Sequence, residues 1–281
     1  MGTIVSIEVV ADAGDPGEAV ERAFDWFHRI ENCCSRFEPE SELMQLTHQI
    51  GMPVPASAIL FEVVQFALAV AKECGGAFDP TIGLSMERRG FNREHRTGTI
   101  IRTAIDSDDT VSYRDVRLDP AHRTITLLRP MVLDLGAVAK GFAIDMAARE
   151  LAHFADFAVD AGGDLYMGGH NRTGEPWSIG IRHPRHEDSV IESIRVSNQA
   201  VCTSGDYERG LHILDPKTRS SATTAASVTV LAPTAMLADA LATAAFVLGP
   251  AKGIELLERL EVDGLIFTPE LDRFATLGMR S

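Results

Sequence analysis

The segment from Leu133 to Gly141 constrains the fold of this chain most, because it joins the end of an apolar run to the start of a helix. Its sequence, Leu-Asp-Leu-Gly-Ala-Val-Ala-Lys-Gly, predicts a strand that ends at Asp134 and a helix from Ala137 to about Ala152. A helix start presents unpaired N–H groups and a partial positive charge, which suit a phosphate. Lys140 in the first helical turn would add a full charge. Asp134 would hydrogen-bond a ribose or a base edge, or lie near a metal ion.

A second indication of a binding site lies in the apolar helix predicted from Thr234 to Leu248. Asp239 and Thr243 stand four residues apart and therefore share one face of this helix. A buried carboxylate needs either a partner charge or a metal ion. The residues alone leave two interpretations open. Either the two side chains bind a metal ion, or Asp239 pairs locally and Thr243 hydrogen-bonds to its own helix, as most buried polar side chains do.

The composition limits the class of protein. A chain of 281 residues with 45% hydrophobic and 23% charged residues can bury a large core. Its net charge of −14 argues against a nucleic-acid partner, because binding a phosphate backbone needs clustered lysine and arginine. The four cysteines lack metal-ligand spacing, so free thiols are expected. No apolar run approaches the length of a membrane span.

The start of the chain bears on its location in the cell. No cationic, apolar leader and no lipobox precede the first strand-like segment, so the sequence as it stands predicts a cytoplasmic protein. If an N-terminal leader is missing from it, the prediction changes to the periplasm.

The order of predicted elements favours an α+β fold with antiparallel sheet over a doubly wound α/β fold, because strands outnumber helices and tight turns join several of them. We expect a single domain over residues 1–281, built as one lobe or as two closely packed lobes, with an inserted, irregular or partly helical segment at about 80–115. Further helices are predicted at 16–34, 57–74 and 252–260. Strands are predicted at 2–10, 116–118, 124–128, 157–159, 177–181, 189–196, 200–203, 211–214, 227–231 and 264–268.

Seven further short motifs are distributed along nearly the whole chain, from residue 1 to residue 244. They are MGT (1–3), SRFEPESEL (35–43), GAFDPTIG (76–83), AGGD (161–164), TSGDY (203–207), HILDPKT (212–218) and ADALATA (238–244). Together with the segment 133–141 they resemble the signature motifs of the ApbE family, the FAD:protein FMN transferases. This resemblance implies a T-fold-like α+β domain with packed helices, in which the flavin site lies between the sheet and the inserted segments.

The resemblance also implies that FAD is the substrate, and it assigns contacts to it. Phe37 would lie against the isoalloxazine ring, and Asp79 would accept a hydrogen bond from a base or ribose. The residues alone leave open that Phe37 is a core residue and that Asp79 caps an Asp-Pro turn. The implied FAD contacts are Met1, Phe37, Ala77, Phe78, Asp79, Asp134, Lys140, Thr203, Ser204, His212 and Ile213.

A divalent metal ion follows from the same resemblance, bound by the side chains of Asp239 and Thr243 and by the backbone carbonyl of Ala137. These oxygen donors suit Mg²⁺. The chain departs from the family at two positions. Ala242 stands where some relatives carry a second aspartate, which removes one ligand, and Arg219 stands where the family often has glycine in a turn.

The implied activity is Mg²⁺-dependent transfer of FMN from FAD to a serine or threonine hydroxyl of an acceptor protein, with release of AMP. Lys140 would stabilise phosphate charge. Asp206 or His212 would orient or deprotonate the attacking hydroxyl, and the sequence does not choose between them. Two alternatives use the same site: an FAD pyrophosphatase that yields FMN and AMP, and a non-catalytic FAD-binding or FAD-storage protein.

Overall fold

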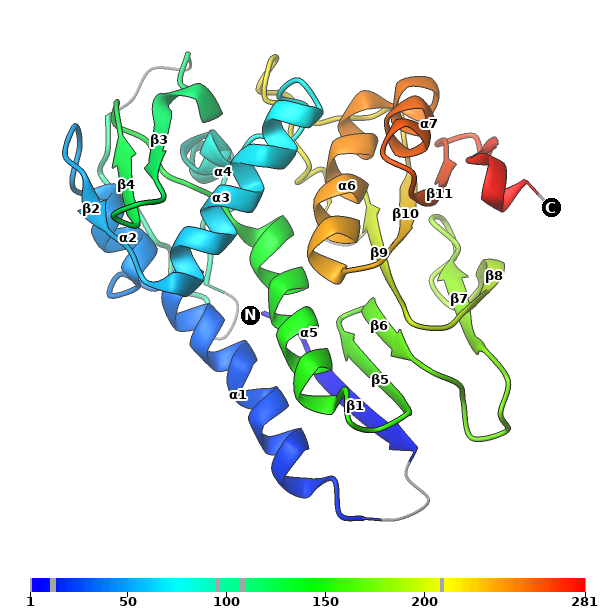
Figure 1. Ribbon diagram of the computed structural model, residues 1–281. Coiled ribbons are helices and arrows are strands. Elements are labelled where there is room, and N and C mark those ends of the chain that lie inside the picture. The colour runs from blue at the N-terminus through cyan, green and yellow to red at the C-terminus, as the bar shows by residue number, and fades with distance from the viewer. Residues whose placement is uncertain (1, 11–13, 95–96, 107–109, 208–209, 281) are drawn as a thin grey trace. The chain divides into compact units, whose positions relative to one another are not determined.

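The computed structural model describes residues 2–10, 14–94, 97–106, 110–207 and 210–280. The chain divides into two compact units, whose helices and strands are labelled in Figure 1. The first unit contains residues 28–139 and 214–221 together with Gly2, and the second contains residues 3–27, 140–213 and 222–280. That residues 1–281 form a single domain stays a prediction, and these units are the candidates for its two lobes.

The second unit is built on a seven-stranded sheet in which all neighbouring strands are antiparallel. The expected antiparallel sheet of an α+β fold is thereby confirmed. The strand order is β1-β5-β6-β9-β10-β11-β12. The strands are β1 (Val5–Val10), β5 (Asp156–Ala161), β6 (Asp164–Gly168), β9 (Gln199–Gly205), β10 (Ser227–Ala232), β11 (Asp263–Phe267) and β12 (Arg273–Ala275).

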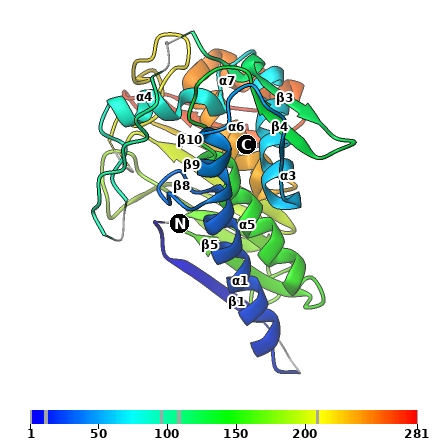
Figure 2. The ribbon, with the colours of Figure 1, turned by 90° about the vertical axis from the view of Figure 1, so that its left-hand side faces the viewer.

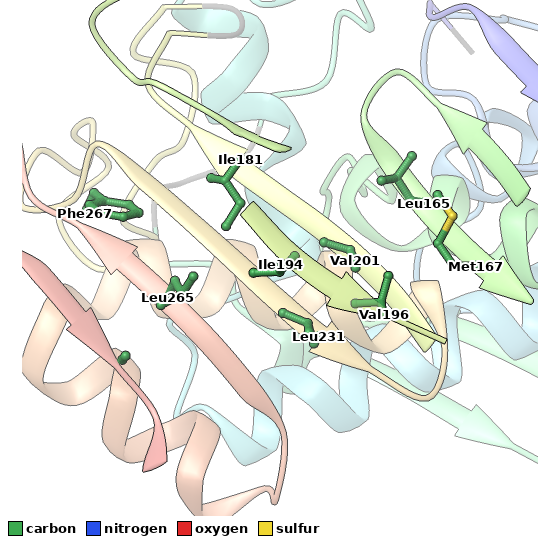
Figure 3. Packing of buried hydrophobic residues seen from close by; sticks show 10 residues of the cluster. Leu165, Met167, Ile181, Ile194, Val196, Val201, Leu231, Leu265 and Phe267 are labelled. Atoms are coloured by element: carbon green, nitrogen blue, oxygen red, sulfur yellow. The ribbon is translucent and has the colours of Figure 1, made fainter. Parts of the chain in front are cut away.

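Both faces of this sheet are covered, which explains why all six residues of β10 are buried without alternation. Helices α6 (Ala235–Leu248) and α7 (Pro250–Arg259) pack on one face, against β9, β10 and β11. A hairpin of β7 (Trp177–Arg182) and β8 (Val190–Val196) covers the other face. The apolar side chains between hairpin and sheet, drawn in Figure 3, include Ile181, Ile194, Val196, Val201, Leu231, Leu265 and Phe267.

The first unit contains a three-stranded sheet of order β2-β4-β3 and several helices. The hairpin of β3 and β4 is the green two-stranded ribbon of Figure 2. Within residues 80–115, the described part is partly helical, as predicted. The elements are α2 (Glu42–Thr47), β2 (Val54–Pro55), α3 (Ala58–Glu73), η1 (Pro80–Ile82), α4 (Gly83–Arg88), η2 (Tyr113–Asp115), β3 (Val116–Asp119) and β4 (Thr124–Leu127). Its fully buried apolar residues include Ile30, Leu43, Leu46, Leu60, Ile125, Leu127 and Leu133.

The helix boundaries follow from capping chemistry. Ser57 Oγ accepts a hydrogen bond from the N–H of Leu60 at the start of α3, and Thr234 Oγ1 accepts one at the start of α6. Gly249, at a φ of 75°, ends α6, and Pro250 begins α7. The long helices α1 (Gly17–Cys34) and α5 (Gly136–Leu151) were also predicted to within a few residues, and each contributes residues to both units. Within the described ranges, we find no helix long and apolar enough to span a membrane.

The prediction of a strand at residues 211–214 is wrong. Leu214 makes only an isolated bridge to Ser221, and Leu211 is 52% exposed. The strand predicted to end at Asp134 is also absent, because residues 131–135 form an irregular segment before α5. The prediction also missed α2, β2, β6 and β12. Strand β6 was not predicted because Gly162 and Gly163, which precede it, are typical of a simple turn. Both adopt left-handed φ angles, of 68° and 89°, and they form the tight connection of a β5–β6 hairpin.

Helices α5 and α6 approach each other closely at Gly141. A Cβ atom at this position would lie 2.4 Å from the carbonyl oxygen of Ala235 and 2.6 Å from Met236 Cα, which are backbone atoms. We therefore predict that Gly141→Ala lowers the free energy of unfolding by about 1–3 kcal/mol. Urea denaturation measures this loss. Gly17→Ala is the control, because a Cβ atom there meets only the side chain of Asp15, at 3.1 Å. Equal losses in the two variants would contradict the close approach.

Asp145 of α5 caps the start of α6. Its carboxylate accepts hydrogen bonds from the N–H groups of Ala235, at 2.7 Å, and Met236, at 3.0 Å. It therefore satisfies two N–H groups that have no partner within their own helix. Burial raises the pKa of this carboxyl group to about 6, although the two N–H donors and Arg149 act in the opposite direction.

This raised pKa predicts a pH-dependent contribution to stability. A carboxyl group whose pKa is about 6 in the folded state and 3.8 in the unfolded state stabilises the fold fully below its unfolded pKa. That contribution is lost as the pH rises through about 6. We expect the unfolding free energy of the wild type, relative to Asp145→Asn, to fall by at most about 3 kcal/mol between about pH 4 and about pH 7. Urea denaturation at several pH values measures this difference, and a value independent of pH would contradict the prediction.

Candidate functional site

Three charged side chains of the second unit form a cluster. Lys140 of α5 makes an ion pair with Asp164, at the start of β6, and another with Asp239 of α6, in which Nζ lies 3.7 Å from Oδ2. The side chains of Asp164 and Asp239 are 2% and 8% exposed, and that of Lys140 is 27% exposed. Two buried carboxylates that share one ammonium group carry a net negative charge. Such a cluster stabilises a further cation.

Hydroxyl groups lie beside this cluster. Thr243 follows the carboxylate of α6 by one helical turn, as predicted, and its Oγ1 lies 3.4 Å from Ser204 Oγ in β9. Thr203 points to the opposite face of the sheet, where its Oγ1 lies 2.9 Å from Thr229 Oγ1, because side chains alternate along a strand. The backbone N–H of Thr203 donates to Asp164 Oδ1, at 3.0 Å. The structure thus places the hydroxyls of Thr203 and Ser204, which were both predicted to contact FAD, on different faces of the sheet.

The donors of this cluster fit a hard divalent cation. Asp239 and Thr243 present a carboxylate and a hydroxyl from one face of α6, and Mg²⁺ prefers such oxygen ligands. Among the described residues, no three His, Cys, Asp or Glu side chains are arranged to hold a metal ion, so backbone or substrate oxygens would have to complete the coordination. Ala137, the third predicted donor, is the second residue of α5 and belongs to the first unit.

The two candidates for the general base have different surroundings. The carboxylate of Asp206 accepts two hydrogen bonds from Arg185, at 2.8 and 3.0 Å, and this pairing raises the pKa of Arg185. The ring Nδ1 of His212 lies 2.9 Å from the carbonyl oxygen of Gly210. A carbonyl oxygen only accepts, so Nδ1 carries the proton and the neutral ring has its lone pair on Nε2. This tautomer can accept a proton at Nε2.

In the first unit, Asp134 is held firmly by the fold. Its Oδ1 accepts from the N–H of Gly136 at the start of α5, at 2.9 Å, and its Oδ2 accepts from Arg36 Nε, at 2.7 Å. Its own N–H donates to the carbonyl oxygen of Pro80, at 2.7 Å. Asp134 therefore fixes the start of α5 relative to the GAFDPTIG segment. Its contact with a ribose, a base or a metal ion stays a prediction.

Arg36 joins two residues that the resemblance assigns to the flavin. It is 8% exposed, and besides Asp134 it binds the carbonyl oxygen of Phe91, at 2.5 Å from Nη2. Its guanidinium carbon lies 4.1 Å from the centre of the Phe37 ring, which is a cation–π contact. Arg36 therefore fixes both the Asp134 carboxylate and the Phe37 ring.

We predict that Arg36→Ala lowers the free energy of unfolding by about 1.5–3 kcal/mol, because it removes a charge-assisted hydrogen bond to a carboxylate in a largely buried environment. Urea denaturation measures the loss. Arg129→Ala is the matched control, since Arg129 is more exposed and lies 3.9 Å from its carboxylate partner Asp115. Arg129→Ala should lower the free energy of unfolding by less than about 1 kcal/mol. A loss for Arg36→Ala no larger than that of the control would show that the Arg36 contacts contribute little.

The GAFDPTIG segment is also internally bonded. Asp79 Oδ1 accepts from the N–H and the hydroxyl of Thr81, and Oδ2 accepts from the N–H of Tyr113. Asp79 thus caps the Asp-Pro turn, which was the alternative to a flavin contact. Ala77 and Phe78 are buried, as is Ile213 of the second unit. Their contacts with FAD stay predictions, and Met1 lies outside the described residues.

Arg219 occupies a turn in the conformation that glycine adopts most easily. Its φ is 56°, in the left-handed region. Its guanidinium donates to Ser85 Oγ, at 3.2 Å, and to the carbonyl oxygen of Val111, at 2.7 Å. The turn therefore keeps a glycine-like backbone while the arginine side chain binds two other segments of the first unit.

Sequence reasoning missed three residues of these clusters. Asp164 stood in a recognised motif without an assigned role, and its place after two glycines was the available signal. Arg36 stood in the recognised motif SRFEPESEL and Arg185 in none, and neither was assigned a role, since each acquires its partner only when separate segments of the chain meet.

The antiparallel sheet, the packed helices and an acidic cluster beside a lysine define an α+β protein with a candidate cation site. The chain belongs to the ApbE family, whose family model matches residues 1–266. The family resemblance predicted from the motifs is thereby confirmed.

Individual relatives agree with this assignment. The chain is 33% identical, over 245 residues, to an FAD:protein FMN transferase of Haemophilus influenzae, covering 80% of this chain and 71% of that protein. It is 33% identical, over 315 residues, to an FAD:protein FMN transferase of Treponema pallidum, covering 99% of this chain and 85% of that protein. Among solved structures, it resembles the ApbE protein of Thermotoga maritima with a TM-score of 0.87 and 29% identity, covering 99% and 95% of the two chains. The flavin transferase ApbE of Vibrio cholerae gives a TM-score of 0.86 and 26% identity, covering 100% and 96%.

Proposed function

We propose that this chain is an Mg²⁺-dependent FAD:protein FMN transferase, which moves FMN from FAD to a serine or threonine hydroxyl of an acceptor protein. The observation that carries the proposal is the cluster of Lys140, Asp164 and Asp239, with Thr243 beside it, in a chain of the ApbE family. Its curated relatives are FAD:protein FMN transferases, which supports the same activity here. FAD is then the substrate, and a protein with an accessible serine or threonine is the partner.

In the proposed reaction, the acceptor hydroxyl oxygen attacks the phosphorus of the FMN half of FAD. A bond forms between this oxygen and the phosphorus, and the bond from the phosphorus to the bridging oxygen breaks. AMP leaves with the bridging oxygen, and the hydroxyl proton passes to a base. No group is oxidised or reduced.

Asp239 and Thr243, together with the carbonyl group of Ala137, would hold Mg²⁺. When bound, the ion would neutralise charge on the pyrophosphate and make AMP a better leaving group. Asp164 holds the ammonium group of Lys140 next to Asp239. Lys140 then balances the carboxylates and presents positive charge to the phosphates.

We favour His212 over Asp206 as the base. Both carboxylate oxygens of Asp206 already accept hydrogen bonds from Arg185, at 2.8 and 3.0 Å, so an attacking hydroxyl would have to compete with the guanidinium for them. The hydrogen bond from His212 Nδ1 to Gly210 leaves the lone pair of the neutral ring on Nε2. For FAD itself, Phe37, held by Arg36, stays our candidate for the contact with the isoalloxazine ring.

One experiment separates this proposal from its alternatives. Water in place of the acceptor hydroxyl would make the chain an FAD pyrophosphatase, and binding without reaction would make it a storage protein. The purified chain is incubated with FAD and Mg²⁺, with and without an acceptor domain, and the nucleotides are separated by chromatography. AMP that forms only with the acceptor supports transfer. FMN that forms without the acceptor supports hydrolysis, and unchanged FAD supports storage.

A further inference from the structure

Asp145 links α5 to the first turn of α6, and the proposed reaction assigns it no chemical step. Its carboxylate accepts the N–H groups of Ala235 and Met236. Gly141, one turn earlier on the same face of α5, lets the backbone of α6 approach, since a Cβ atom there would overlap Ala235. Helix α5 therefore holds the start of α6 at two successive positions.

The same two helices carry the charged cluster. Lys140 directly precedes Gly141 in α5, and Asp239 follows Ala235 by one helical turn, about 6 Å along the axis. The ion pair of Lys140 with Asp239 thus joins α5 and α6 at a third position. Its geometry depends on where the first turn of α6 lies on α5.

We infer that Asp145 is a positioning residue, which fixes the first turn of α6 on α5 and thereby places Asp239 and Thr243 for Mg²⁺ and the FAD pyrophosphate. This inference rests on the proposed function. Helix α6 already has a cap of its own in Thr234, whose Oγ1 accepts from the N–H of Leu237. Asp145 differs from this cap because it reaches α6 from another helix, and so it sets the place of α6 as well as its stability.

The test compares Asp145→Ala with Thr234→Ala, because each removes one cap of α6 and only the first removes the link to α5. Kinetics of FMN transfer are measured below the unfolding temperature of both variants. We expect Asp145→Ala to lower kcat at least tenfold and to raise the Mg²⁺ concentration for half-maximal activity. The KM for FAD should stay within twofold, because the expected flavin-ring contacts lie elsewhere. Thr234→Ala should keep at least half of the wild-type kcat.

A second variant and a second measurement keep the inference open to refutation. The variant is Asp145→Asn, which is nearly isosteric and replaces Asp145→Ala if that protein does not fold. Calorimetric titration with Mg²⁺ in the absence of FAD should show weaker binding in the Asp145 variant than in Thr234→Ala. Equal kcat and equal Mg²⁺ affinity in the two variants would reduce Asp145 to a helix cap, and a change in the KM for FAD alone would also overturn the inference. If the wild-type chain transfers no FMN, the proposed function fails, and the calorimetric comparison decides the role of Asp145.

Discussion

Asp239→Asn should lower the rate of FMN transfer on the order of 10³-fold while leaving the fold intact. Asparagine is nearly isosteric with aspartate, but it removes the one anionic ligand that α6 offers to a hard cation. A metal ion contributes several kcal/mol to transition-state stabilisation, and about 4 kcal/mol corresponds to that loss of rate. Steady-state kinetics at saturating FAD measure the rate, and circular dichroism checks the fold.

Asp272→Asn is the control for this prediction. It makes the same change of charge at an exposed position in the connection between β11 and β12. We expect its transfer rate to match that of the wild type. If Asp239→Asn keeps the wild-type rate and Mg²⁺ dependence, Asp239 serves only as a partner of Lys140 and the metal site lies elsewhere.

His212→Ala should lower kcat by about 10²- to 10⁴-fold, the usual contribution of a general base. Asp206→Asn should lower kcat by less than about tenfold, because Arg185 already binds both oxygens of Asp206. The substitution would then affect the reaction only by shifting the loop that carries residue 206. Added imidazole should restore part of the rate of His212→Ala, since it supplies a base without the side chain. Single-turnover kinetics with a saturating acceptor measure both variants.

The opposite ranking would change the mechanism. A large loss in Asp206→Asn, with little loss in His212→Ala, would make Asp206 the base. It would also imply that Arg185 releases the carboxylate when the substrates bind. Failure of imidazole to restore any rate would assign His212 a binding role.

The long helices were predictable because their boundaries depend on local chemistry. Ser57 and Thr234 act as caps through their own side chains, and Gly249 ends α6 through its own backbone angle. Spacing along one helix likewise placed Asp239 and Thr243 on a common face before any tertiary contact was known. The strand at 211–214 failed because apolar residues in a short run do not distinguish a strand from an irregular loop.

The ion-pair partners of the site residues could not be predicted from the sequence. Lys140 was expected to face a phosphate, but which carboxylate balances it depends on how β6 and α6 pack, and Asp164 lies 24 residues away. Arg36 and Asp134 are 98 residues apart, and nothing local to either indicates the pair. The opposite orientations of Thr203 and Ser204, in contrast, follow from strand alternation and were predictable.

The most direct test of FMN transfer is the intact mass of an acceptor domain after incubation with the purified chain, FAD and Mg²⁺. A variant of the acceptor in which the target serine or threonine is alanine serves as the control. We predict that the acceptor gains the mass of one FMN less one water, that the control acceptor gains nothing, and that Asp239→Asn slows the gain on the order of 10³-fold. An acceptor of unchanged mass, whether FAD is cleaved to free FMN or stays intact, would contradict the assignment of this chain as an FMN transferase.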